Sequence, residues 1–188
     1  NANDAVYGPI DMSDALKVSS DLYFYQLGLD AKAAKGGGDI QDWAFDYGLG
    51  EESGIDLPGE TPGLVPTPSW RNRLYRDREK LNCALCPDRP WRAGDNINLA
   101  VGQGDLQASP LQMAVMAAAF ANGGQIVTPH LVRGDTSHPP RRIELPPAIF
   151  EPIRRGMWKV VNDGGTGASS RVAGVEIAGK TGTVQVVA

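Results

Sequence analysis

Residues 175–187 read Val-Glu-Ile-Ala-Gly-Lys-Thr-Gly-Thr-Val-Gln-Val-Val, and they place the polar group Lys180-Thr181-Gly182-Thr183 inside an otherwise apolar stretch. The β-branched and apolar residues on both sides of this group predict a β-strand. We expect such a strand to present an ammonium group, two hydroxyls and a backbone N–H along one wall of a cleft. The simpler alternative is a surface strand with a Thr-Gly bend, because short motifs also arise by chance.

The composition limits what the chain can be. Its 188 residues suffice for one domain or most of one, and 41% hydrophobic and 21% charged residues are typical of a globular chain. A formal net charge of −4 argues against a basic surface of the kind that binds nucleic acid. No apolar run approaches the roughly 20 residues that cross a bilayer, and no signal peptide is visible. If the parent protein is exported or anchored, we expect that segment to lie outside these residues.

The first part of the chain predicts two consecutive helices. Ser13 or Asp14 can cap a short first helix, which Ser19-Ser20-Asp21 interrupts. The same polar residues can cap a second helix, and Gly36-Gly37-Gly38 ends it.

The later part of the chain predicts a buried helix and a return into the strand of residues 175–187. Ser109 and Pro110 suit the N-cap and first position of a helix over 111–121, which is apolar all round and is therefore expected in the core. We also expect short strands over 125–128 and 131–133, a Pro-rich loop over 134–147 and a helix over 148–162. This order predicts an α+β fold in which a mainly helical lobe packs on part of an antiparallel sheet.

Cys83 and Cys86 form a C-x-x-C pair. This spacing suits a local disulfide, half of a zinc site or a redox pair. A zinc site normally needs four ligands, and the two histidines lie far away in the sequence. A redox pair would be expected in a βαβ context, which is absent. A local disulfide or free thiols are therefore the favoured interpretation.

Ser19 and Lys180 are the candidates for acyl-transfer chemistry. Transfer at an activated carbonyl needs a nucleophile, a base and donors for the oxyanion. Neither histidine lies near a Ser-rich turn, which argues against a Ser-His-Asp arrangement. A Ser/Lys system is the alternative. For Ser20 and Asp21 the simpler role is that of a helix N-cap.

Five segments follow one another along the chain: residues 15–26 (ALKVSSDLYFYQ), 54–60 (GIDLPGE), 100–104 (AVGQG), 109–114 (SPLQMA) and 180–183 (KTGT). Together they resemble the transpeptidase domain of class B penicillin-binding proteins, most closely the PBP2 type of rod-shaped cell elongation. Several such segments in the right order are far more specific than any single motif. The resemblance implies a fragment of the penicillin-binding protein and serine β-lactamase-like fold.

The resemblance also implies catalytic roles. Ser19 would join the hydrogen bonds that move protons between the nucleophile and the leaving amine. Asp21 would take the place that Asn more often holds, facing the substrate amide. Lys180 would supply positive potential and orient Ser19.

A second implied group binds the substrate. It consists of Thr181, Gly182 and Thr183, whose two hydroxyls would hold the carboxylate of a terminal D-alanine or of a β-lactam. The N–H of Thr183 would be one of the oxyanion donors. No metal or organic cofactor is implied.

The family's nucleophile, in an S-x-x-K motif, has no counterpart here. None of the lysines has a serine three positions before it; they are Lys17, Lys32, Lys35, Lys80, Lys159 and Lys180. We therefore expect residues 1–188 to be a partial transpeptidase domain that lacks the upstream S-x-x-K segment and the C-terminal strands and helix. Such a chain alone is expected to be inactive.

The function implied by the resemblance is peptidoglycan D,D-transpeptidation on the extracytoplasmic face of a bacterial inner membrane. The expected partners are stem peptides, β-lactam antibiotics and other cell-wall synthesis proteins. One alternative is a related serine acyl enzyme, such as a D,D-carboxypeptidase, a β-lactamase or a β-lactam sensor. Another is a noncatalytic scaffold of the wall-synthesis complex. An unpaired strand edge in the fragment could also pair with a second copy.

Overall fold

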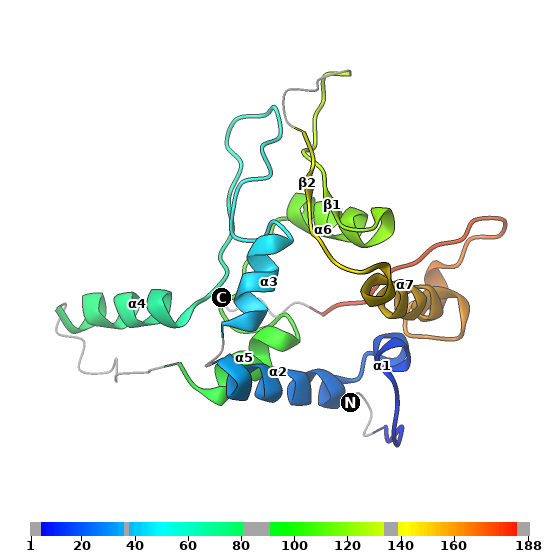
Figure 1. Cartoon of the computed structure of the whole chain (residues 1–188), viewed down its shortest axis with the longest axis horizontal. Helices are drawn as coiled ribbons and strands as arrows, with labels where there is room; N and C mark the ends of the chain where they lie inside the picture. Colours follow the sequence, from blue (N-terminus) through cyan, green and yellow to red (C-terminus); the bar gives the residue numbers. More distant parts are fainter. Residues whose placement is uncertain (1–4, 36–37, 81–90, 134–138, 184–188) are drawn as a thin grey trace.

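The computed structural model describes residues 5–35, 38–80, 91–133 and 139–183. The elements in these ranges are α1 (Met12–Val18), α2 (Asp21–Lys35), α3 (Asp39–Asp46), α4 (Pro68–Lys80), α5 (Ala93–Ala100), α6 (Pro110–Asn122), β1 (Gln125–Ile126), β2 (Arg141–Arg142), α7 (Pro147–Asn162) and the 3₁₀ turn η2 (Ala168–Ser170) (Figure 1). Helices dominate, and β1 and β2 form an antiparallel pair, which confirms the predicted α+β class. Within the described ranges, no helix has the length and apolar character that a membrane crossing requires.

The contact between α1 and α7 matters most for the site. Gly156 of α7 lies so close to α1 that an added Cβ would be 2.9 Å from Leu16 Cβ and 3.1 Å from Ser13 Cα. The buried Ser13 hydroxyl donates a hydrogen bond of 2.9 Å to the carbonyl of Pro152. An ion pair of 2.6 Å joins Lys159 to Asp14. These contacts hold α1 against α7 (Figure 1).

A second close contact joins α2 to α5. Asn96 is fully buried, and its side-chain amide donates to the carbonyl of Gly28 at 3.2 Å. The Asn96 carbonyl oxygen accepts a hydrogen bond of 3.0 Å from Trp91 Nε1. A side chain at position 28 would meet the backbone of α5 at 2.9 Å, so the absence of a Cβ there permits the approach.

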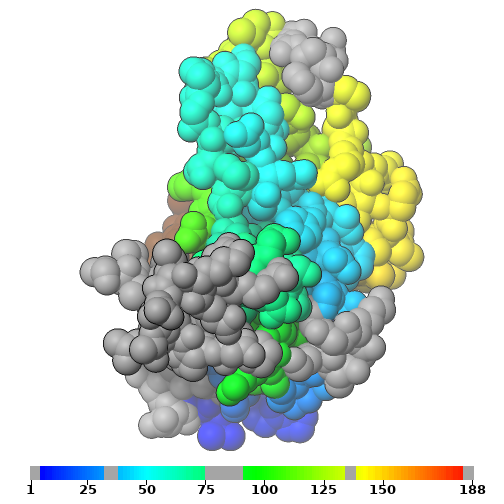
Figure 2. Space-filling view, turned by 90° about the vertical axis from the view of Figure 1, so that its left-hand side faces the viewer, coloured from blue at the N-terminus to red at the C-terminus, as the bar shows by residue number. Residues whose placement is uncertain are grey.

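The small sheet lies on α6. Its register pairs Gln125 with Arg142 and Ile126 with Arg141. The buried cluster beneath it consists of Tyr47, Ala119 and Ile143, with Met116, Phe120, Ile126 and Leu145 packed around it. In the space-filling view, the cyan loop over 51–63 lies at the upper left and the yellow segment after 139 lies at the right (Figure 2). Arg141 joins these two segments through an ion pair of 3.2 Å to Glu51.

The structure corrects two predictions about helices. The N-cap of α1 is Asp11, whose Oδ1 accepts from the N–H of Asp14 at 2.8 Å, whereas Ser13 is directed into the α7 contact. Helix α6 begins as predicted with Ser109 as N-cap, but it is not buried all round. Its buried residues are Gln112, Val115 and Ala119, whereas Met113, Ala114, Ala117 and Ala121 are exposed. An apolar sequence shows that a helix can be buried but does not decide which neighbours cover it.

Predicted strands are also corrected. Residues 131–133 form bends and a turn, because the N–H groups of Leu131 and Val132 bind the carboxylate of Asp56 at 2.7 and 3.1 Å. The predicted Pro-rich loop contains β2 instead.

Residues 176–183 have no strand assignment, although the sequence predicts one. A strand requires a ladder of backbone hydrogen bonds, whereas the backbone of this segment bonds to α7 and to side chains. Gly179 N–H donates to the Met157 carbonyl at 3.1 Å, and the Asn162 amide donates to the Ile177 carbonyl at 2.8 Å. Residues 184–187 of the predicted strand lie outside the described residues.

Candidate active site

Ser19 stands at the junction of α1 and α2. It is the C-cap of α1 with φ 53° and ψ 54°, and it is the one non-glycine residue with positive φ in the part of the chain that the structure describes. A left-handed conformation costs a non-glycine residue about 1–2 kcal/mol. The N–H groups of Ser19 and Ser20 bind the last carbonyls of α1, at 3.2 Å to Leu16 and 2.9 Å to Ala15, and so hold the turn. Such strain is frequent at functional sites.

Lys180 donates a hydrogen bond of 2.8 Å from its Nζ to the Ser19 hydroxyl, across 161 residues of sequence. The same ammonium group donates to the Thr181 carbonyl at 2.8 Å. Partial burial lowers the pKa of Lys180 below its usual value, and the negative charge of Asp21 opposes that shift. The structure thus brings together the two residues that the sequence singles out for acyl-transfer chemistry.

Ser20 and Asp21 begin α2. Ser20 is buried, and its hydroxyl accepts a hydrogen bond of 3.4 Å from the N–H of Tyr23, which is the N-cap contact expected of a serine there. Asp21 lies in the first turn, where a carboxylate is favoured by the helix dipole. Its negative charge acts on Lys180, so Asp21 and Lys180 contribute to one electrostatic site.

Two residues without a role in the sequence analysis lie beside the Thr181–Thr183 segment. Thr166 Oγ1 is 2.7 Å from Thr181 Oγ1, and either hydroxyl can be the donor. The side-chain amide of Gln103 donates to the Thr183 carbonyl at 2.8 Å. Glycines on both sides of each residue signal a turn in the sequence, but a turn does not say what it will face.

This arrangement can move a proton and bind an anion. The Ser19 hydroxyl and the Lys180 amine are within the range required for proton transfer. Thr181 and Thr183 are exposed residues, and a threonine hydroxyl can donate to a carboxylate. His130 lies elsewhere, 3.4 Å from the Thr128 carbonyl.

Metal binding finds no support in the described residues, where no group of three His, Cys, Asp or Glu side chains could hold an ion. Cys83 and Cys86 lie outside the described residues, so the disulfide and zinc interpretations stay predictions.

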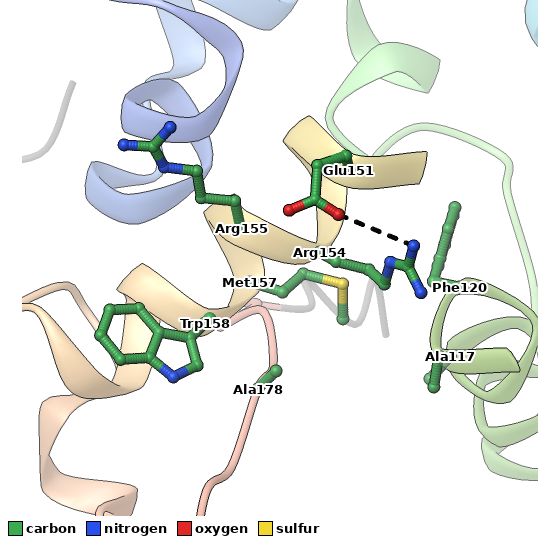
Figure 3. A pocket seen from close by; sticks show the side chains of 9 residues that line it. Ala117, Phe120, Glu151, Arg154, Arg155, Met157, Trp158 and Ala178 are labelled. Carbon is green, nitrogen blue, oxygen red and sulfur yellow. Dashed lines mark ion pairs between the residues drawn. The ribbon is translucent and has the colours of Figure 1, made fainter. Parts of the chain in front are cut away.

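A separate hollow of about 660 Å³ lies between α6 and α7 (Figure 3). Its lining includes Phe120, Met157, Trp158 and Ala178. Among the residues that line it, Ala178 is the one nearest to Lys180 in the sequence, two residues before it. The guanidinium of Arg154 at its edge is paired with Glu151 at 3.7 Å. Its walls are largely apolar, and its charged lining residues are Glu151, Arg154 and Arg155, so it is separate from the Ser19 and Lys180 site.

The family model described as penicillin binding protein transpeptidase domain matches residues 1–188. The peptidoglycan D,D-transpeptidase MrdA of Haemophilus influenzae is 34% identical over 96% of this chain and 27% of the relative. The enzyme of the same name from Acinetobacter baumannii is 32% identical over 96% of the chain and 26% of the relative. The chain therefore spans about a quarter of the length of these curated relatives.

Solved structures of penicillin-binding proteins resemble this chain in fold and sequence. PBP2 in complex with MreC from Helicobacter pylori has a TM-score of 0.80 and 30% identity, over 96% of this chain and 31% of that one. Pseudomonas aeruginosa PBP2 in complex with WCK 5153 has a TM-score of 0.78 and 31% identity, over 99% of this chain and 41% of that one. The motif order, the fold and these relatives together confirm the resemblance, and the chain belongs to the penicillin-binding protein transpeptidase domain family.

Proposed function

We propose that this chain supplies two of the three motif segments in the active site of a peptidoglycan D,D-transpeptidase. The observation that carries the proposal is the 2.8 Å hydrogen bond between Lys180 and Ser19, which joins the S-x-D and KTGT segments in one site. The whole protein would attack the D-Ala-D-Ala bond of a stem peptide, form a serine acyl-enzyme and pass the acyl group to the amine of a second stem. Since no lysine here has a serine three positions before it, the nucleophile comes from outside these residues.

The hydrogen bond from Lys180 sets the direction of proton movement. Because the ammonium donates to the Ser19 oxygen, the single proton of the Ser19 hydroxyl is left to point elsewhere, toward the leaving amine. When that amine takes the Ser19 proton, Lys180 can replace it. Partial burial lowers the pKa of Lys180, so the ammonium gives up a proton more readily than an exposed lysine does.

Substrate binding is assigned to the segment over 181–183. The hydroxyls of Thr181 and Thr183 would hold the terminal carboxylate, and Asp21 would face the substrate amide. The Thr183 N–H would stabilise the oxyanion, and such donors are typically worth about 10²–10³ in rate. The N–H of the nucleophile itself would complete the oxyanion hole, so the isolated chain lacks half of it.

The relatives favour the transpeptidase over the alternatives. Those with the name MrdA are D,D-transpeptidases, which argues against a carboxypeptidase, a β-lactamase or a sensor. A noncatalytic scaffold would have no need of the Lys180–Ser19 contact. One solved relative is a complex with MreC and another belongs to a peptidoglycan synthase complex, so we propose cell-wall synthesis proteins as partners at the extracytoplasmic face of the inner membrane.

For the isolated chain we propose that an unpaired strand edge can pair with a second copy. Light scattering at high protein concentration tests this, and a monomer there would contradict it.

The test of the proposed function uses the whole protein that contains this chain. Its acylation by a fluorescent penicillin is followed for the native protein and for the variants Ser19→Ala and Lys180→Ala. Each variant should acylate more slowly by about 10²-fold or more, the usual contribution of a proton-transfer group. Ser170→Ala, an exposed serine of η2, is the matched control and should label normally. Normal labelling of both site variants would refute the proposal.

A further inference from the structure

Thr166 links the two motif segments from a third direction. Its N–H donates a hydrogen bond of 3.1 Å to the carbonyl of Lys17, in the last turn of α1 and two residues before Ser19. Its hydroxyl lies 2.7 Å from the hydroxyl of Thr181, the residue that follows Lys180. Thr166 therefore contacts both the helix that carries Ser19 and the segment that carries Lys180.

The turn that carries Thr166 is held tightly on α7. The N–H of Gly167 donates to the Val160 carbonyl at 3.0 Å. A Cβ at position 165 would be 2.6 Å from Val160 Cα, and one at position 167 would be 2.9 Å from Val160 Cγ1. Glycine on both sides lets the turn lie against the helix, and this contact limits where the Thr166 hydroxyl can point.

The number of protons decides which hydroxyl donates. A threonine hydroxyl carries one proton and two lone pairs. If Thr181 gives its proton to a substrate carboxylate, the hydrogen bond at 2.7 Å can persist only with Thr166 as the donor. A chain of two hydroxyls that ends on an anion also polarises both bonds in the same direction and strengthens them.

We propose that Thr166 is a positioning residue that donates to Thr181 and thereby directs the Thr181 proton at the carboxylate of the acyl donor. This rests on the proposed function, since it assumes that Thr181 binds that carboxylate. Through this hydrogen bond, Thr166 makes a peptide that ends in a free carboxylate a better acyl donor than a peptide that ends in a neutral group.

The experiment compares two acyl donors on the whole protein that contains this chain. One is an N-acylated peptide that ends in D-Ala-D-Ala, and the other is the same peptide with a C-terminal carboxamide. Thr166→Val removes the hydroxyl and keeps the shape and the backbone N–H, whereas Thr166→Ser keeps the hydroxyl. For the carboxylate donor, Thr166→Val should lower kcat/KM about 10-fold, mainly through KM, as expected for weakening a hydrogen bond to a charged group. For the carboxamide donor the loss should be less than about twofold, and Thr166→Ser should stay close to the native protein on both.

A double-substitution cycle guards against a merely structural effect. Once Thr181→Val has removed the acceptor, adding Thr166→Val should lower kcat/KM no further. Equal losses on the two donors, or additive losses in the cycle, would overturn the proposed positioning role. A native protein that acylates from neither donor would instead refute the proposed function, and a native protein that acylates while Thr166→Val matches it refutes the inference alone.

Discussion

Replacing Gly156 by alanine tests whether the contact between α1 and α7 sets the geometry of the site. The new methyl would lie 2.9 Å from Leu16 Cβ and 3.1 Å from Ser13 Cα, both held by the backbone of α1. Since ordinary contacts begin at 3.4 Å, α1 must move away from α7 by about 0.5 Å. Ser19 is the C-cap of α1, so it moves with that helix, whereas the Lys180 segment stays on α7 through the hydrogen bond from the Gly179 N–H to the Met157 carbonyl.

The magnitude follows from two opposing terms. Overpacking costs about 1–3 kcal/mol. Alanine in place of glycine inside a helix stabilises by about 1 kcal/mol. We therefore expect Gly156→Ala to lower the free energy of unfolding by about 1 kcal/mol, the difference between these terms. Displacement of a reacting group by 1 Å can cost about 10²-fold in rate, so a shift of half that size should slow acylation about 10-fold.

The assay measures thermal unfolding and the rate of penicillin acylation for the whole protein that contains this chain. Gly94→Ala is the matched control, because Gly94 also lies in a helix and a Cβ there meets nothing within 4 Å. The control should be as stable as the native protein or slightly more so, with an unchanged acylation rate. If Gly156→Ala matched the control in both measurements, the reasoning that α1 and α7 position Ser19 against Lys180 would be wrong.

Three further predictions concern the charge of Asp21, the ion pair of Arg71 and the absence of a nucleophile from the isolated chain. Asp21→Asn removes the charge that raises the pKa of Lys180, so that pKa should fall further and the alkaline limb of the acylation profile should move to lower pH; an unmoved limb in a pH–rate series would contradict this. Arg71→Ala breaks a largely buried ion pair of 2.7 Å with Asp95 and should lower the free energy of unfolding by about 2 kcal/mol, whereas the exposed Arg73→Ala should change it by less than about 0.5 kcal/mol in denaturant titrations. Equal effects of the two arginine substitutions would count against the ion pair. The isolated chain treated with penicillin should show no covalent adduct in intact-mass spectra, and a stable serine-linked adduct would disprove the absence of a nucleophile.

The lowered pKa of Lys180 also makes folding stability depend on pH. The pKa of Lys180 is lowered in the folded protein, so the unfolded chain binds more protons between the folded pKa and the usual value of 10.5. Folding stability therefore carries a small penalty below the folded pKa, and this penalty is relieved as the pH rises toward 10.5. The cost is the desolvation of an ammonium group at a place where the proposed chemistry needs it.

Local patterns predicted the helices well. The apolar spacing over 148–162 corresponds to α7, and Ser109-Pro110 begins α6 as expected. The prediction that α6 is buried all round was wrong, because Met113 is 46% exposed. The assignment of Ser13 as a cap was also wrong, because its hydroxyl is taken by α7. In each case the sequence describes what a residue can do locally, and a distant contact decides between the choices.

The sequence by itself determined the family, the predominance of helices and the identity of the two polar motifs, since these depend on residue types and their order. The tertiary structure alone decided that Lys180 reaches Ser19 and that Thr166 reaches Thr181, over separations of 161 and 15 residues. No local periodicity extends that far. Such encounters depend on how closely two helices approach, and here Gly156 permits α1 and α7 to touch while Gly165 and Gly167 let the next turn lie on α7.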